Sequence, residues 1–294
     1  MEDHIMSALM TAMKAGEIKS CYMGPAISPE QFIPEHFFLF LAKGVIEGYD
    51  GHKKYILRPG QYCLVRKNHL ARYSKQKDKD GFEKIIVVFD QPFLKDFAKR
   101  YKHATQRSNP DTAFILLKKD ALIPHFIHSL MPYYNEKGRI DEALAHVKRE
   151  ELLILLLQRN PELAGILFDF REPEKMDLEE FMNKNYKFNV SIQRFAYLTG
   201  RSLSAFKRDF AAIFGDTPSR WLIQRRLREA HFLIEKGNRP SDIYLDLGFE
   251  DLSHFTYVFR KKYGRAPGSI KGPSSSNDGS HPGKSRPPAV PGRR

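Results

Sequence analysis

Seven side chains that can donate hydrogen bonds recur at helical spacing in two segments of the chain. They are Ser204, Lys207 and Arg208 in the first segment and Ser253, Thr256, Tyr257 and Arg260 in the second. Groups of this kind bind phosphate oxygens and the edges of nucleic acid bases. A helix advances about 100° per residue, so this spacing puts each set on one solvent face. The two sets are therefore candidate contacts for a nucleic acid such as double-stranded DNA.

The helices that must carry these side chains repeat each other at an offset of 49 residues. Each copy has aromatic residues four apart and then a Gly-x2-Pro stop: Phe206, Phe210, Phe214, Gly215 and Pro218, then Phe255, Phe259, Tyr263, Gly264 and Pro267. Such a repeat is typical of one supersecondary unit used twice. We expect helices over 202–214 and 251–263, with Leu203, Ile213 and Leu252 buried beside the aromatic residues.

A short helix is expected before each recognition helix. Ser191–Gly200 and Ser241–Gly248 each offer a serine N-cap, about two turns, and a glycine able to adopt φ > 0. This order is typical of a helix-turn-helix unit. The sequence of residues 221–236 predicts one continuous helix, which would act as a rigid spacer between the units. Five apolar residues lie near one face of it: Leu222, Leu227, Ala230, Leu233 and Ile234.

Residues 177–272 resemble the DNA-binding domain of AraC/XylS-type transcription regulators. The resemblance rests on the second unit, with Asp242-Ile243, Leu247-Gly248-Phe249 and the aromatic series that ends at Pro267. It implies two helix-turn-helix units in successive major grooves, about 34 Å apart, and RNA polymerase as a further partner. Tyr244, where the family usually has alanine, and Tyr257, where many members carry arginine, depart from the pattern.

The roles expected at the DNA follow from side-chain type. In the first unit, Lys207 and Arg208 can reach guanine edges or phosphates, with Ser204 near the groove floor. In the second unit, Ser253, Thr256 and Tyr257 are the base-side candidates, and Arg260 is expected on a phosphate. The amides at the helix starts near Ser202 and Asp251 are also expected to clamp phosphates, although Asp251 itself repels them.

The net charge of +13 is concentrated in the repeat. Residues 181–272 hold 17 basic against eight acidic residues, and residues 1–180 are nearly balanced at 27 against 26. A basic module beside a neutral one is the footprint of phosphate binding. A solvated cationic face is the alternative, which the paired motif disfavours.

Residues 34–90 change to short apolar runs between turns, which predicts strands. The expected strands are Phe37–Ala42, Val45–Tyr49, Tyr55–Leu57, Tyr62–Val65, Ala71–Ser74 and Lys84–Phe89. Their spacing indicates a small antiparallel barrel, and Leu57–Tyr73 resembles part of a cupin barrel, as in sensory domains of such regulators. That resemblance implies a small-molecule effector. His36 and His69 lie in strand positions without an H-x-H pair, so we expect hydrogen-bonded histidines and neither a metal nor a cofactor.

Helices are expected over Gln91–Tyr101, Ala121–Tyr134, Ile140–Arg159 and Pro161–Phe168. The first should pack Phe93, Leu94 and Phe97 on the barrel. The third carries a broad stripe: Leu144, Val147, Glu151, Leu152, Leu155 and Leu156. The resemblance implies that helices within 121–168 form a homodimer contact, and intradomain core is the equal alternative for this stripe.

The predicted fold class is α+β: an N-terminal small antiparallel, cupin-like β-barrel with a helical subdomain, then an all-α double helix-turn-helix domain. The expected boundaries are 1–170 for a sensory or dimerisation domain, 171–176 for a linker, 177–272 for the DNA-binding domain and 273–294 for a disordered tail. Within the first, the barrel covers about 34–90 and the helices about 91–170. A short helix is expected near 7–15 in a partly ordered start.

Other function classes fit less well. Cys21 and Cys63 form no C-x-x-C, so zinc fingers, a disulfide scaffold and a cysteine-dependent DNA-repair protein are disfavoured. A metal-dependent cupin enzyme would need clustered His and carboxylate ligands in 34–90, so we expect no enzyme. The longest apolar runs have six residues, far below the ~20 of a membrane span, and a cytoplasmic protein is expected. A nonspecific architectural DNA binder stays open.

Overall fold

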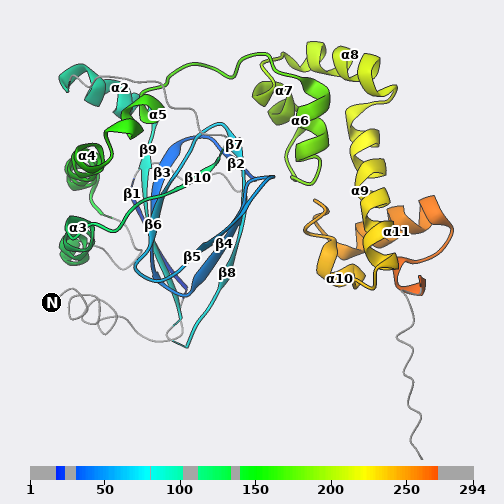
Figure 1. The fold of residues 1–294 in the computed structure, drawn as a ribbon, viewed down its shortest axis with the longest axis horizontal. Helices are drawn as coiled ribbons and strands as arrows, with labels where there is room; N and C mark the ends of the chain where they lie inside the picture. Colours follow the sequence, from blue (N-terminus) through cyan, green and yellow to red (C-terminus); the bar gives the residue numbers. More distant parts are fainter. Residues whose placement is uncertain (1–17, 24–30, 80, 102–111, 134–139, 271–294) are drawn as a thin grey trace, which may run out of the picture.

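The computed structural model describes residues 18–23, 31–79, 81–101, 112–133 and 140–270. Its N-terminal part contains three β-sheets (Figure 1). The five-stranded sheet has the order β1 (Ile18–Met23), β9 (Phe82–Phe89), β3 (His36–Lys43), β6 (Tyr62–Val65) and β10 (Phe114–Leu116). A three-stranded sheet has the order β5 (Lys54–Leu57), β4 (Val45–Tyr49) and β8 (Arg72–Gln76), and β2 (Phe32–Ile33) pairs with β7 (His69–Leu70).

All six predicted strands are present, with ends shifted by up to two residues. The prediction missed β1, β2 and β7. The strand pairs within residues 34–90 are antiparallel, as predicted. Strand β1 lies outside that range and pairs with β9 in parallel, with Ile18 opposite Phe82. Among the described strands, the hydrogen bonds form three sheets rather than one closed ring.

Strand β3 is buried on both faces, which explains its unbroken apolar sequence. Phe38 and Phe40 point into a cluster that includes helical residues, and Leu39 and Leu41 point into a second cluster between the sheets. Alternate residues of a strand face opposite sides, so one strand serves two cores. The N-terminal strands therefore have one face for helices and one for the interior.

Four helices cover the outer face of the five-stranded sheet (Figure 1). They are α2 (Gln91–Arg100), α3 (Leu122–Leu130), α4 (Glu142–Arg159) and α5 (Ala164–Leu167), with 3-10 turns at Met131–Tyr133 and Pro161–Leu163. Phe93, Leu94 and Phe97 of α2 are buried as predicted. Leu152 and Leu156 of α4 are also core residues, whereas Val147 is 58% exposed. Most of the predicted stripe on α4 is therefore intradomain core.

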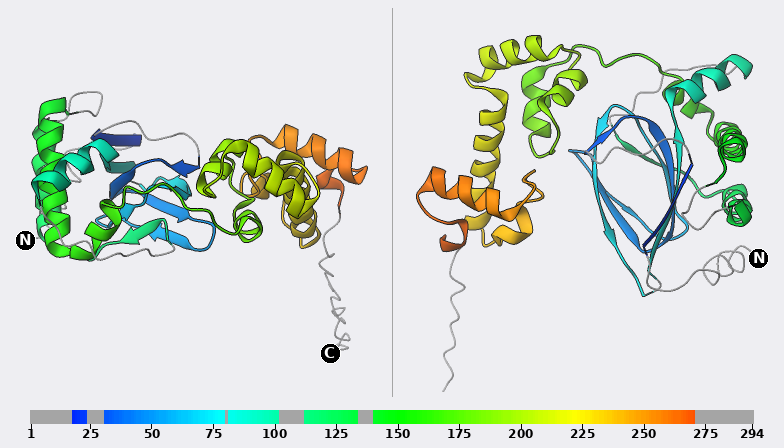
Figure 2. Two further views of the ribbon diagram at one scale, coloured as in Figure 1. Left: turned by 90° about the horizontal axis from the view of Figure 1, so that it is seen from above. Right: turned by 180° about the vertical axis from the view of Figure 1, so that it is seen from behind.

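The described residues from 178 to 270 form helices joined by turns and lie beside the strands (Figure 2). The helices are α6 (Leu178–Asn185), α7 (Ile192–Leu198), α8 (Leu203–Phe214), α9 (Pro218–Glu235), α10 (Pro240–Ile243) and α11 (Leu252–Tyr263), with a 3-10 turn at Pro267–Ser269. We call α7 with α8 the first unit and α10 with α11 the second unit. The spacer helix α9 is longer at its start than predicted, because Thr217-Pro218 opens it with proline in the first turn.

Helix α10 differs from its prediction. Ser191 caps α7 by accepting from the Arg194 amide, as expected. In the second unit the corresponding Ser241 hydroxyl instead donates to the Asp242 carboxylate, and α10 begins at Pro240 without a side-chain cap. Without that cap the helix runs for four residues and continues as turns to Gly248.

An extended segment, residues 169–177, joins α5 to α6. Its backbone at Glu174 and Lys175 lies against Gly200, where a Cβ would be 2.5 Å from both. The predicted helix near 7–15 and the predicted disordered tail from Pro273 fall outside the described residues. No described helix is both long enough and apolar enough to cross a membrane.

Candidate nucleic-acid interface

The two recognition helices, α8 and α11, are built alike. The Ser202 hydroxyl accepts from the Ala205 amide at 3.3 Å, and the Asp251 carboxylate accepts from the His254 amide at 2.6 Å. Gly215 and Gly264 end the helices in the left-handed conformation, with φ of 65° and 71°. Each helix is 12 residues long and begins one residue after the predicted position.

The capping contacts limit what these helix starts offer to phosphates. The cap side chains already bond the Ala205 and His254 amides, which are third-residue amides of their helices. Only the earlier amides of each first turn are left for an anion. The predicted phosphate clamp therefore has fewer donors than the sequence indicated.

The aromatic repeat forms the core of each unit. In the first, Phe210 lies 5.7 Å from Phe206 and 4.3 Å from Phe214, measured between ring centroids, and Trp221 of α9 closes the group. In the second, Phe255, Phe259 and Tyr263 form the same series. The predicted burial of Ile213 and Leu252 was wrong: they are 45% and 39% exposed, because each lies in a terminal turn beyond the apolar cluster of its unit.

The predicted DNA-facing side chains lie opposite these aromatic cores. Six of the seven are exposed and Thr256 is half-buried: Ser204, Lys207, Arg208, Ser253, Tyr257 and Arg260 are the exposed ones. Tyr257 is the most prominent apolar ring among them, at 65% exposure. Both units thus present one polar face to solvent, and the base and phosphate roles of these residues stay predictions.

Arg208 has a protein partner that the sequence analysis missed. Its guanidinium lies 3.0 Å from Asp209, whose other oxygen accepts from Arg201 at 3.2 Å. These hydrogen bonds, first from Arg201 and then from Arg208, lower the pKa of the Asp209 carboxyl. Arg208, in the middle of α8, therefore has a carboxylate partner on its own helix. The signal was present in the repeat, since the corresponding residue of the second unit is Val258.

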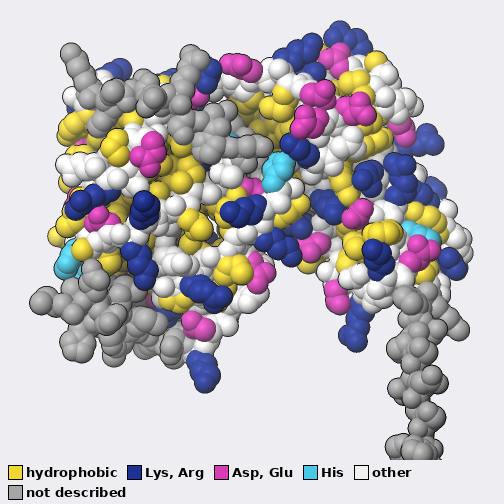
Figure 3. Space-filling model, in the orientation of Figure 1, with side chains coloured by type: hydrophobic (Ala, Val, Ile, Leu, Met, Phe, Trp, Pro, Cys, Tyr) yellow, Lys and Arg dark blue, Asp and Glu magenta, His cyan; other side chains and the backbone are white. Residues whose placement is uncertain are grey.

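Basic side chains gather over α8 and along the side formed by α9 and α11 (Figure 3). They include Lys207 and Arg208 on α8, Arg220 at the start of α9, and Arg260 and Lys261 on α11. The exposed positive charge follows both recognition helices. This arrangement suits the two phosphate backbones that flank a major groove.

The N-terminal region packs on the first unit. Phe32 and Leu70 of β2 and β7 are buried in the same cluster as Phe206 and Phe210. Arg194 of α7 lies over the Phe32 ring at 3.9 Å. The N-terminal region thus shares the buried core of the first unit.

Arg72 joins the three-stranded sheet to the second unit. The Arg72 guanidinium lies over the Tyr49 ring at 4.8 Å, donates to the Asp246 carbonyl at 2.6 Å and pairs with its carboxylate at 3.2 Å. Asp246 lies in the turn that follows α10. The N-terminal region therefore touches both units.

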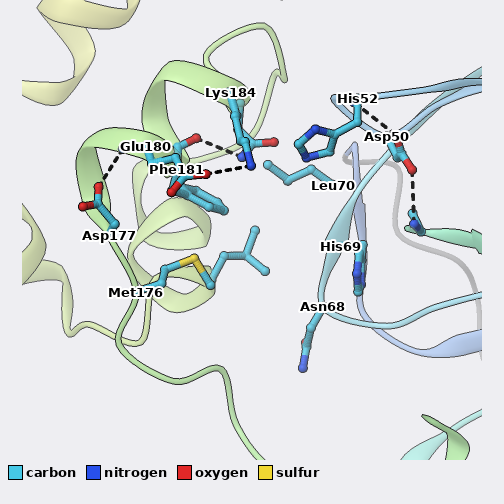
Figure 4. Close-up of a pocket in the computed structure, with 13 residues that line it drawn as sticks. Asp50, His52, Asn68, His69, Leu70, Met176, Asp177, Glu180, Phe181 and Lys184 are labelled. Atoms are coloured by element: carbon cyan, nitrogen blue, oxygen red, sulfur yellow. Dashed lines mark hydrogen bonds and ion pairs between the residues drawn. The ribbon is translucent and has the colours of Figure 1, made fainter. Parts of the chain in front are cut away.

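A cavity of about 240 Å³ lies between the sheets and α6 (Figure 4). Asp50, His52 and His69 line it from the strand side, and Glu180 and Lys184 line it from α6. The Asp50 carboxylate is engaged within its own hairpin, where it accepts from the Tyr55 hydroxyl at 2.7 Å. The cavity therefore borders both parts of the chain.

Both predicted strand histidines belong to hydrogen-bond networks. His36 Nδ1 accepts from the Lys67 amide at 3.2 Å, and His69 Nδ1 is 2.7 Å from the Lys67 carbonyl. Burial, followed by the charge of Lys67, lowers the pKa of His36 well below its usual value, so its ring is neutral near pH 7. Both rings are hydrogen-bonded as predicted, although Nε2 of His36 is buried and has no hydrogen-bond partner among the described residues.

Two family models match the chain. One is described as the ExsA N-terminal regulatory domain and matches residues 36–166; the other is a helix-turn-helix domain and matches residues 195–272. Together they cover more than two thirds of the chain, and the second covers the repeated motif. The chain belongs to the AraC/XylS-type transcription regulators. This AraC/XylS-type regulator is a sequence-specific DNA-binding protein.

Three relatives illustrate its place in the family. It is 25% identical to the transcriptional activator VirF of Yersinia enterocolitica over 79% of this chain and 87% of that one. It is 25% identical to the regulator ExsA of Pseudomonas aeruginosa over 85% and 91%. The transcriptional activator RhaS of Yersinia pestis shares 29% identity over 84% and 92%. All three alignments extend over both parts of the AraC/XylS-type regulator.

Proposed function

We propose that one chain reads two half-sites about 34 Å apart in successive major grooves on one face of the duplex. The observation that carries this proposal is the likeness of α8 and α11: equal length, matching caps and the same exposed face. The single helix α9, with 18 residues, joins them. It is about 27 Å long at 1.5 Å per residue, which is comparable to one turn of DNA.

The proposed contacts follow the exposed faces. Arg208 and Lys207 donate to guanine edges or phosphates, and Ser204 lies near the groove floor. On α11, Arg260 contacts a phosphate, and three side chains contact bases: Ser253, Thr256 and Tyr257.

The experiment that tests this function starts from fragments of the host genome selected by the full-length protein. Footprinting of the selected sites should show two protected half-sites separated by about one helical turn. A single protected patch would contradict the bipartite proposal. Failure to prefer any fragment over bulk DNA at physiological salt would instead support a nonspecific architectural binder.

We further propose that the protein activates transcription by contacting RNA polymerase. The proposal is supported by relatives that are named transcriptional activators, VirF and RhaS. Transcription from a selected target promoter with purified polymerase should rise when the protein is added. A fall would identify a repressor.

We propose that the domains follow the sequence: a sensory or dimerisation domain over 1–170, a linker over 171–176, the DNA-binding domain over 177–272 and a tail beyond. In this proposal the strands form a cupin-like barrel and a small-molecule effector occupies the cavity beside α6. The 240 Å³ cavity and its position between the two parts support an effector there. Fragment 1–170 should not bind the operator, and binding by it would contradict the assignment.

We also propose a homodimer through the outer face of α3 and α4. Three large apolar side chains are exposed there or in the turn that follows α3: Leu122, Tyr133 and Val147. Sedimentation of the wild type should give a dimer, and Val147→Glu should shift it toward monomer without unfolding it. A monomeric wild type at micromolar concentration would exclude this contact.

A further inference from the structure

The two units have separate apolar cores, and both cores use α9. Trp221 and Leu222 of α9 belong to the core of the first unit, whereas Leu227 and Ala230 belong to the core of the second. Arg226 lies between these groups and is 8% exposed. Its spacing of four residues from both Leu222 and Ala230 places it on the buried face of the helix. A charged side chain therefore occupies the boundary between two cores.

The Arg226 guanidinium bonds three backbone carbonyls from two distant segments. Nε donates to the Tyr186 carbonyl at 2.7 Å, and one Nη donates to the Phe188 carbonyl at 2.8 Å. The other Nη donates to the Gly248 carbonyl at 2.8 Å. Tyr186 and Phe188 lead into α7, and Gly248 lies in the turn before α11. One side chain thus joins the start of the first unit, the spacer helix and the turn of the second unit.

The partners of Arg226 are neutral, which is unusual for a buried guanidinium. Burial lowers its pKa to about 10, so the group stays protonated near pH 7. A planar fork of five donors can reach three carbonyls at once, and a lysine ammonium, a compact point charge, cannot reproduce that geometry. The site is built for an arginine rather than for positive charge alone.

Other contacts surround the same joint. A Cβ on Gly248 would be 2.6 Å from the Lys187 carbonyl, so the two segments approach closely there. The Asn189 amide side chain donates to Glu250 at 2.9 Å, close to the surface. A cavity of about 360 Å³ opens between the units beside Arg226 and Gly248. Hydrogen bonds, together with α9, therefore connect the two units at this joint.

We propose that Arg226 is the positioning residue that fixes the two recognition helices relative to each other and thereby sets the half-site spacing the protein accepts. This inference rests on the proposed bipartite function. A rigid joint holds the two recognition helices at the correct spacing before DNA binds, so binding at one half-site favours binding at the second. A loosened joint would let each unit find its half-site separately and would accept other spacings.

The test uses the full-length protein and a selected operator, with one or two base pairs inserted between its half-sites, and each half-site alone. Wild type should lose affinity steeply with each insertion. Arg226→Lys and Arg226→Met should bind the native operator roughly tenfold or more weakly, the loss expected when charge-assisted bonds at a buried joint are removed. Their penalty for an insertion should be much smaller, and their affinity for single half-sites should equal that of wild type.

Arg228→Lys, on the exposed side of the same helix, is the matched control and should behave as wild type. If both Arg226 variants unfold, Asn189→Ala decides, because it removes the exposed bond of the joint without opening the core. It should relax the spacing preference in the same direction but less. Variants that keep the wild-type dependence on spacing would overturn the inference. A wild type indifferent to spacing would instead overturn the bipartite function.

Discussion

The first helix-turn-helix unit shares its core with the N-terminal strands, whereas the second has a core of its own. Phe32 and Leu70 belong to the same buried cluster as Phe206 of the first unit, and the second unit meets the strands through the Arg72–Asp246 pair. Packing of buried apolar groups is worth more than a partly exposed ion pair. A change in the N-terminal region should therefore reach the first unit directly and the second mainly through α9.

The largest expected effect tests whether the two cores are separate. Phe210→Ala should lower the free energy of unfolding by about 3–5 kcal/mol, because a fully buried ring leaves a cavity. Phe259→Ala is the matched change in the second unit. Trp221, the single tryptophan, packs against Phe210 and reports the first unit. In Phe259→Ala the Trp221 fluorescence transition should come after the loss of helical circular dichroism; coincident transitions would show one shared core.

The next effect concerns base reading by the first unit. Arg208→Ala should weaken operator binding by about 1–3 kcal/mol and relax the preference at one base pair. Arg260→Ala, the control on α11, should weaken all sequences alike, since it is expected on a phosphate. Titration against the operator and single-base variants separates the two outcomes. Equal, sequence-independent losses would show that α8 reads DNA with another face.

A mismatch scan of the operator compares the two units directly. Charge-assisted contacts are roughly twice as strong as neutral ones, and α8 offers Lys207 and Arg208 where α11 offers hydroxyl groups. Mismatches under α8 should cost about 1–3 kcal/mol each, and those under α11 less. Larger penalties under α11 would show that Tyr257 or the deformability of the DNA carries more information than charge.

The ion pair between the strands and the second unit should have a small effect. Arg72→Ala should change global stability by at most about 1 kcal/mol, because Asp246 is largely exposed. Hydrogen exchange should become faster in the turn after α10 and stay unchanged in α7. Arg58→Ala, an exposed arginine in the turn after β5, is the control. Faster exchange in α7 would contradict separate attachment of the two units.

Lowering the pH should destabilise the first unit through Asp209, whose counterpart in the second unit is Val258. A lowered pKa in the folded state means that this carboxylate stabilises the protein above its unfolded pKa, about 4. That stabilisation is lost as the pH falls through the lower folded value. The stability difference between wild type and Asp209→Asn should therefore shrink as the pH is lowered from about 5 to about 3. A difference independent of pH would mean that the ion pairs contribute nothing.

Local patterns predicted the recognition helices well and the contacts between elements poorly. Aromatic spacing and Gly215 determine α8 within the helix itself, and the predicted bounds were nearly correct. The parallel strand β1 and the short α10 depend on neighbours that no local pattern shows. Arg226 was missed because a charged residue on a helix is usually taken to face solvent, even where its position in the helix is a buried one. Its four-residue offset from Leu222 and Ala230 was a usable signal that it lies on the buried face. Asp209 was missed for the same reason.

Gly200 limits where this chain can be joined to a domain of another regulator. Its φ of 63° already favours glycine, and the backbone of Glu174 and Lys175 occupies the space that a side chain would need. The extended segment is therefore fitted to the turn between α7 and α8, and its last residues belong structurally to the helices that follow. A hybrid regulator should be joined before Glu174, within 169–172. A junction placed after Lys175 would bring a foreign backbone against this turn and should misplace α8.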